Sequence, residues 1–87
     1  MNNTRLEHYI DLSTTVNGFI DTINNLIDSK EKNFAWYYYR IIMNFLRYEC
    51  YKTNRITFKA YVYFINRVDN SINIEYLINN VSYETLI

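Results

Sequence analysis

The side chains that most often perform catalytic or metal chemistry are few and scattered in this 87-residue sequence. His8 is the sole histidine and Cys50 the sole cysteine, and neither lies in a cluster with the spacing of metal ligands. We interpret His8 as a solvated or capping residue in the first turn of a helix, and Cys50 as a small core or boundary residue. There is no glycine-rich phosphate loop, nucleophile elbow or paired-carboxylate motif. The sequence therefore predicts no catalytic residue, no metal and no cofactor, and favours binding.

Glu49 is an acidic residue that the helical pattern places on an apolar side. It shares a wheel position with Ile42, seven residues earlier. A carboxylate there either reaches water near the end of the helix or pairs with a basic residue of a neighbouring helix. A catalytic acid is the weakest of the three interpretations.

An aromatic run, Phe34 to Tyr39, ends at Arg40. Successive residues of a helix rotate by about 100°, so these rings cannot all face the core, and Tyr37 should face solvent. One interpretation is that large rings fill the core of a thin bundle. Because Tyr, Trp and Arg are enriched at interfaces, the other is a partner-facing surface. The predicted partner-binding residues are Trp36, Tyr37, Arg40, Asn44, Arg47, Lys59, Tyr63 and Tyr83.

The elements that would position these side chains are helices. The chain has no proline and one glycine, too few turn residues for a β-rich or loop-rich fold. Apolar periodicity predicts helices over about 5–29, 34–52, 57–69 and 72–81. Short polar connections make an antiparallel four-helix bundle the default packing, as one domain over residues 1–87. The first helix is either continuous or kinked at Ser13 to Thr15, and we favour one long helix.

Local signals mark the helix ends. Thr4 and Glu7 form a capping box, Thr57 is the expected N-cap of the third helix, and Ser29 or Asn33 could cap the second. Gly18 favours a break or a close packing contact nearby.

The same periodicity assigns packed sides. The third helix is apolar over more than half its circumference, which makes it the expected central helix. In the second helix the expected packed residues are Ala35, Tyr38, Ile42, Phe45 and Leu46.

The net charge of zero hides a segregation along the chain. Residues 1–29 carry one basic and four acidic side chains, residues 30–67 carry eight basic and two acidic ones, and residues 68–87 carry three acidic ones. The basic centre could face an anionic partner, the inner membrane surface or the acidic ends of the chain itself. Without a signal peptide or an apolar run long enough to span a bilayer, the chain is expected to be soluble and cytoplasmic.

Part of the central segment resembles the enterocin A type immunity proteins of lactic acid bacteria, which act against pediocin-like (class IIa) bacteriocins. The resemblance covers about a third of the chain. It rests on Arg40-Ile41-Ile42, Asn44-Phe45-Leu46, Tyr48 and Thr53-Asn54-Arg55-Ile56-Thr57-Phe58.

The resemblance implies a cytosolic four-helix bundle that protects the producing cell from a bacteriocin. The implied partner is the membrane permease that serves as bacteriocin receptor, alone or with the bacteriocin bound. The basic and aromatic surface would also suit peripheral contact with the anionic inner face of the membrane. The chain is shorter than the family pattern both before the resembling region and after its last helix.

Two other functions fit the same composition. A small phage- or plasmid-encoded inhibitor of a host protein would have a similar sequence. A helical nucleic-acid-binding module would use the helix over 57–69 as its recognition helix, but the exposed edge of that helix offers little positive charge and the chain is neutral overall. We therefore expect no nucleic-acid partner.

Overall fold

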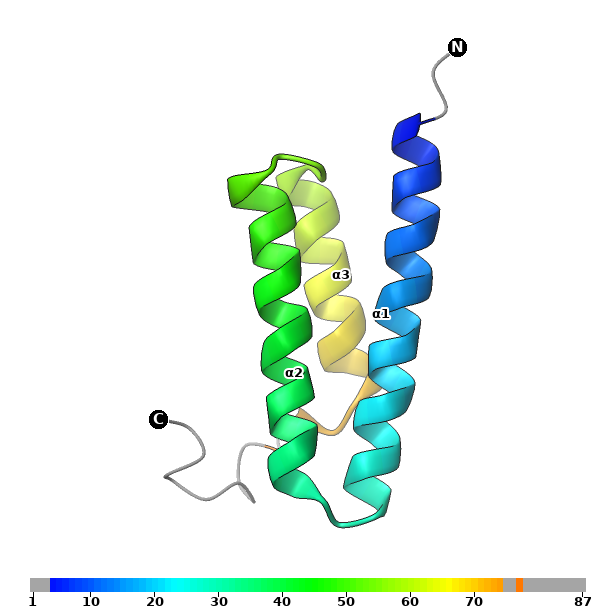
Figure 1. Cartoon of the computed structure of the whole chain (residues 1–87), viewed down its shortest axis with the longest axis vertical. Coiled ribbons are helices and arrows are strands. Elements are labelled where there is room, and N and C mark those ends of the chain that lie inside the picture. The colour runs from blue at the N-terminus through cyan, green and yellow to red at the C-terminus, as the bar shows by residue number, and fades with distance from the viewer. Residues whose placement is uncertain (1–3, 75–76, 78–87) are drawn as a thin grey trace.

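The computed structural model describes residues 4–74 and 77, and they form an antiparallel array of helices (Figure 1). Helix α1 spans Thr4–Asp28, α2 spans Lys32–Arg47 and continues into a π-helical turn η1, Tyr48–Lys52, and α3 spans Phe58–Ser71. No strand occurs among these residues. The all-α prediction is confirmed, but the described part holds three helices and not the four that were expected.

The predicted fourth helix, 72–81, lies largely outside the described residues. Of that range only 72–74 and Leu77 are described, and the Leu77 N–H donates to the carbonyl of Asn73 at 3.0 Å. Ile72 and Leu77 are both buried, so the chain beyond α3 still contributes to the core.

Helix α1 is continuous, as favoured from the sequence, without a kink at Ser13 to Thr15. Gly18 causes neither a break nor a close contact, because no atom lies within 4 Å of the place where a Cβ would stand. The Thr14 hydroxyl donates a hydrogen bond to the carbonyl of Ile10 at 3.1 Å, within the helix.

The turn between α1 and α2 closes by backbone hydrogen bonds. The N–H of Glu31 donates to the carbonyl of Leu26 at 2.8 Å and that of Lys30 to Ile27 at 3.0 Å, which is the Schellman pattern. Lys30 occupies the left-handed position, φ 63°, that glycine usually takes. Glu31 is the N-cap of α2 and makes no side-chain cap bond, so the predicted capping by Ser29 or Asn33 is wrong. The Schellman bonds end α1 so that Glu31, rather than Ser29 or Asn33, takes the N-cap position of α2.

The turn between α2 and α3 follows η1, in the gap between the predicted helices over 34–52 and 57–69. The Thr53 N–H donates to the carbonyl of Tyr48 at 3.0 Å, a wider ring than the α-helical one, and Asn54 has φ 55°. Asparagine tolerates this left-handed conformation better than most residues. The Thr57 hydroxyl accepts from the N–H of Ala60 at 3.1 Å, which confirms Thr57 as the N-cap of α3.

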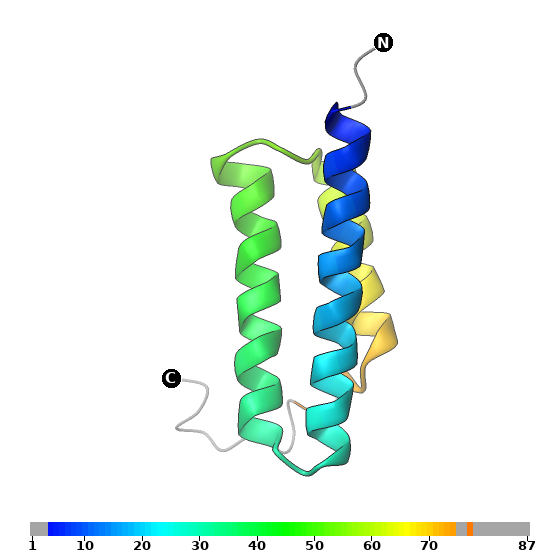
Figure 2. The ribbon, with the colours of Figure 1, turned by 45° about the vertical axis from the view of Figure 1, so that its right-hand side comes forward.

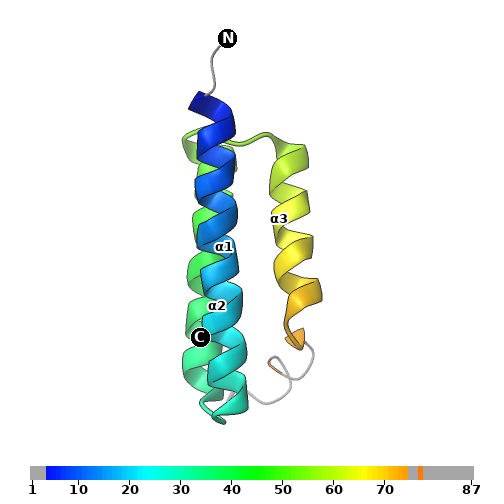
Figure 3. The same ribbon diagram turned by 90° about the vertical axis from the view of Figure 1, so that its right-hand side faces the viewer.

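The core lies mainly between α1 and α2, and α3 covers one side of this pair (Figures 2 and 3). Four residues of α1 and three of α2 are buried, against Phe64 and Val68 from α3. Phe58 of α3 is 61% exposed, and Tyr61 and Ile65 are only partly buried. The prediction of α3 as the central helix is therefore wrong, because much of its apolar surface faces outward.

The packed side of α2 is narrower than predicted. Ala35, Ile42 and Leu46 are fully buried, but Tyr38 and Phe45 are 37% and 40% exposed. The wheel assigned these two rings to the core because they border its apolar sector. In the structure they lie beside the core, on a second apolar side of the helix.

Candidate functional site

One candidate binding surface is the polar strip of α2, defined by Tyr37, Arg40, Asn44 and Arg47. All four side chains are exposed, and Tyr37 is 59% accessible. Spacings of three and four residues bring them to one side of the helix. Neither arginine forms an ion pair within the described residues, so both guanidinium groups can meet an anionic partner.

Trp36 lies at the border of this strip and is partly buried. Its ring stacks on Tyr39 with 5.5 Å between centroids, and its buried indole Nε1 has no hydrogen-bond partner among the described residues. Tyr39 in turn donates its hydroxyl to Asp69 Oδ1 at 2.8 Å, which links α2 to α3. Burial, followed by this hydrogen bond and the charge of Asp69, raises the pKa of the Tyr39 phenol.

The remaining predicted residues do not join the polar strip. Lys59 and Tyr63 of α3 line an apolar groove of about 590 Å³ against Tyr9 and Ile10 of α1. Tyr83 lies outside the described residues. The structure therefore divides the predicted surface between an α2 strip and an α1–α3 groove.

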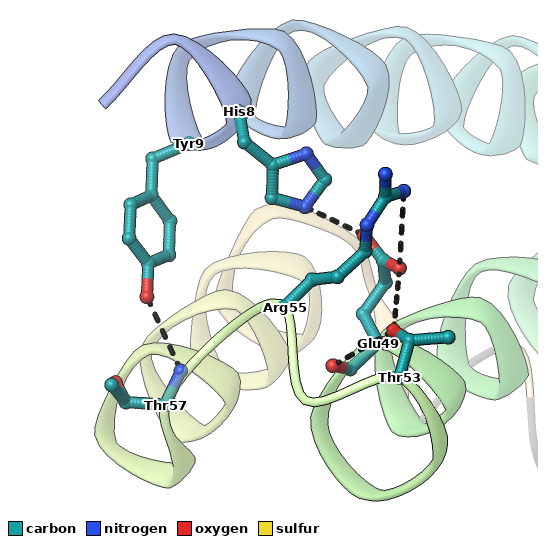
Figure 4. Close-up of polar contacts among 6 residues, drawn as sticks. All are labelled: His8, Tyr9, Glu49, Thr53, Arg55 and Thr57. Carbon is teal, nitrogen blue, oxygen red and sulfur yellow. Dashed lines mark hydrogen bonds and ion pairs between the residues drawn. The ribbon is translucent and has the colours of Figure 1, made fainter. Parts of the chain in front are cut away.

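A polar cluster that the sequence did not predict closes the end of the bundle where α1 begins and the α2–α3 turn lies (Figure 4). The Glu49 side chain is 3% exposed, and its Oε1 lies 2.7 Å from His8 Nε2. Its other oxygen accepts from the Thr53 hydroxyl at 3.2 Å and lies 3.9 Å from Arg55 Nη1. Among the described residues Oε2 is hydrogen-bonded, whereas Oε1 and His8 Nε2 have no hydrogen-bond partner and only face each other. The cost of burying the carboxylate is therefore offset by one hydrogen bond and by its basic neighbours.

The backbone of Glu49 organises the same turn. Its carbonyl accepts from the N–H groups of Arg55 at 2.8 Å and Ile56 at 3.4 Å, and from the Thr53 hydroxyl at 3.4 Å. The π-turn leaves this carbonyl free for them, because the helix does not continue in α-form beyond it. Tyr9 adds a further link from α1 by accepting the Thr57 N–H at 3.2 Å.

These contacts correct two interpretations. Glu49 does not reach water, and it pairs with neighbouring elements, as the second alternative proposed. His8 is neither solvated nor a cap, since its side chain is 25% exposed and faces Glu49. The pairing was not visible in the sequence because it depends on how α1 lies against the turn. The sole signal was a carboxylate on the apolar side of a helix.

The cluster borders a hollow of about 440 Å³. Its lining carries both acidic and basic side chains. It consists of five residues of α1, Thr4, Arg5, Glu7, His8 and Asp11, and of Arg55 from the α2–α3 turn. The arrangement holds the imidazole of His8 in a fixed orientation and ties three chain segments together. We assign it a structural role.

Further polar contacts fix α3 on α1. Arg67 donates from both Nε and Nη2 to the side-chain oxygen of Asn17, with the Nε contact at 3.2 Å. Asn24 donates to the carbonyl of Ser71 at 3.1 Å. Arg67 is therefore engaged within the protein, unlike the arginines of the polar strip.

None of the described helices is both long and apolar enough to cross a bilayer. Among residues 4–74 and 77, no three histidine, cysteine or acidic side chains are grouped so that they could hold a metal ion.

Comparison with family models, curated proteins and solved structures found no match to this chain.

Proposed function

We propose that this chain is a bacteriocin immunity protein that protects its producer from a pediocin-like peptide by binding. The observation that supports the proposal best is the polar strip of α2. Exposed Tyr37, Arg40, Asn44 and Arg47 stand on a helix whose other side is anchored in the core. Aromatic and arginine side chains on a rigid support are typical of binding hot spots.

The proposed partner is the receptor permease at the cytoplasmic face of the membrane, alone or with the bacteriocin bound. Arg40 and Arg47, which form no ion pair with other described residues, suit a site near anionic lipid headgroups, where each basic residue adds about 1 kcal/mol of attraction. Two residues of the resembling segment, Arg40 and Asn44, belong to this strip. A fourth helix over 72–81, which would complete the four-helix form of the family, remains part of the proposal.

The test is expression in a bacteriocin-sensitive strain, scored against a panel of pediocin-like peptides. The wild-type chain should protect against at least one peptide, and Tyr37→Ala with Arg40→Ala should reduce protection while leaving the thermal melting unchanged. Arg5→Ala with Leu6→Ala is the matched control, because it removes an exposed basic and an exposed apolar side chain from α1.

Two results would contradict the proposal. One is a lack of protection against every peptide of the panel by a well-expressed, folded chain. The other is tight retention on duplex DNA that weakens steeply with salt, which would favour the nucleic-acid alternative. Capture of a host enzyme without any protection would favour the inhibitor alternative.

A further inference from the structure

A second apolar side of α2 is exposed. The outer stripe, as we name it, comprises Phe34, Tyr38, Ile41, Phe45 and Tyr48, which are 61%, 37%, 37%, 40% and 53% accessible. Their spacing alternates between four and three residues, the spacing of seams along which helices pack over their length. None of the described helices covers this stripe, so it is free to pack against a helix of another molecule.

The outer stripe exposes a substantial apolar area. Rings of this kind offer roughly 150–250 Å² each, so the exposed fractions leave on the order of 400 Å² of contiguous apolar area. This area falls in the range of the largest apolar patch on a typical soluble monomer, about 300–600 Å², and such a patch is often functional.

We propose that the outer stripe is the interface of a homodimer, in which the α2 helices of two copies pack antiparallel about a two-fold axis at Ile41. The stripe is nearly symmetrical about that residue. Phe34 and Tyr48 each lie seven positions from Ile41, and Tyr38 and Phe45 lie three and four positions away. Antiparallel pairing therefore places an aromatic ring opposite an aromatic ring on each side of the axis, as a self-complementary interface requires.

The charges at the two ends of the stripe specify the same pairing. Glu31 lies three residues before Phe34 and Lys52 four residues after Tyr48, and both are exposed. In the antiparallel dimer Glu31 comes beside the partner's Lys52, and this occurs at both ends. A parallel dimer would place each charge beside its own copy, which is repulsive. This complementarity favours a second copy of the chain over a foreign helix.

The adjacent face of α1 leaves room for the second copy. A depression of about 260 Å³ lies next to the stripe, lined by Thr15, Gly18, Phe19, Thr22 and Tyr38. Small side chains let helices approach closely, and the space over Gly18 is open. The polar strip lies on a neighbouring side of α2, so the dimer adds to the proposed function without using the same residues.

Sedimentation equilibrium of the full chain tests the dimer. The wild type should dimerise with a Kd on the order of 10 µM. Ile41→Asp, which puts two carboxylates at the two-fold axis, should weaken dimerisation at least about 100-fold while the far-UV circular dichroism stays helical. Val62→Asp is the matched control, because Val62 is 38% exposed on α3 and lies outside the stripe.

Charge reversal tests the antiparallel register. Glu31→Lys or Lys52→Glu alone should weaken the dimer by roughly 3- to 10-fold at low salt, and the two together should restore it to within about 2-fold. A wild type that stays monomeric up to about 1 mM overturns the proposal and leaves a foreign helix or a membrane surface as the occupant. Equal weakening by Val62→Asp, or a double reversal that fails to restore the dimer, overturns it as well.

Discussion

Ile41 and Ile42 are neighbours of the same residue type, yet they belong to different surfaces. Ile42 is fully buried between α2 and α1, whereas Ile41 is 37% exposed at the centre of the outer stripe. A rotation of about 100° separates an apolar side that holds the bundle together from one that is left open. In this chain the hydrophobicity of a residue therefore does not decide whether it belongs to the core.

The two sides also differ in composition. The inner side is aliphatic, with Ala35, Ile42 and Leu46 fully buried, and it ends at buried Glu49. The outer stripe is mostly aromatic and is flanked by exposed charges. Small and branched residues permit the close approach that a thin core requires, whereas rings supply area to an interface. The inner side therefore supplies stability, and the outer stripe is the side for which we propose a role in binding.

The largest expected effect on stability comes from truncating a side chain on the inner side of α2, compared with one on the outer stripe. Leu46→Ala should lower the free energy of unfolding by about 2–5 kcal/mol, because it opens a cavity in a core made by few residues. Phe45→Ala, one position earlier and 40% exposed, should cost under about 1 kcal/mol at concentrations where the chain is monomeric. Urea unfolding of both variants measures the difference, and equal losses would show that the two sides are not distinct.

Removal of the buried carboxylate is the next largest effect. Glu49→Ala should cost about 3 kcal/mol, because it leaves His8 and the Thr53 hydroxyl without their shared carboxylate, although the backbone carbonyl that closes the α2–α3 turn remains. Asp11→Ala removes an exposed carboxylate from α1 beside the same hollow and should cost little. Thermal melting of the two variants is the measurement. A stability loss of similar size in both would mean that the polar cluster does not secure this end.

A smaller effect concerns Tyr39 of α2 and the dependence of stability on pH. The unfolded Tyr39 phenol titrates near pKa 10.0, and in the folded protein burial and Asp69 raise its pKa. The folded state therefore keeps a proton that the unfolded state loses, and the stability from Tyr39 is present below about pH 10 and is lost as the pH rises above it.

Tyr39→Phe should lower stability by about 1 kcal/mol at neutral pH and flatten the decline at alkaline pH. Tyr37→Phe, on the exposed strip, is the control and should leave stability at neutral pH unchanged. Urea unfolding at about pH 8 and about pH 11 distinguishes the variants. A decline as steep in Tyr39→Phe as in the wild type would contradict the assignment.

The smallest effect is a gain. Lys30→Gly should raise stability by about 0.5–1 kcal/mol, because Lys30 holds a left-handed conformation, φ 63°, that costs a side chain more than it costs glycine. The substitution lies outside both sides of α2, so it should leave binding unchanged. Chemical unfolding of the variant checks the sign, and a loss of stability would show that the lysine side chain contributes more than the strain it brings.

Local chemistry in the sequence predicted much of the fold. The apolar repeat predicted the three described helices, and the hydroxyl of Thr57 predicted the start of α3. The exposure of the polar strip followed from its charge and from the rotation of the helix. The α1–α2 turn was harder to predict, because it is closed by backbone groups and by a lysine where glycine would have been the usual signal.

Features that depend on how helices pack were not predicted. The pairing of His8 with Glu49 requires two elements distant in sequence to meet, and periodicity contains no information about that distance. The exposure of Tyr38 and Phe45 was missed because an apolar position was taken for a core position. A signal for this exposure was nevertheless present in the sequence, because the apolar residues of the outer stripe recur at alternating spacings of four and three.

The most direct test of the central claim, that one side of α2 holds the fold and the other is open for binding, is the thermal melting of two neighbouring variants at low micromolar concentration. Ile42→Asp should abolish the cooperative transition, because it buries an unpaired charge in the core. Ile41→Asp should melt cooperatively within a few degrees of the wild type. Loss of the transition in both variants, or its survival in both, would contradict the account.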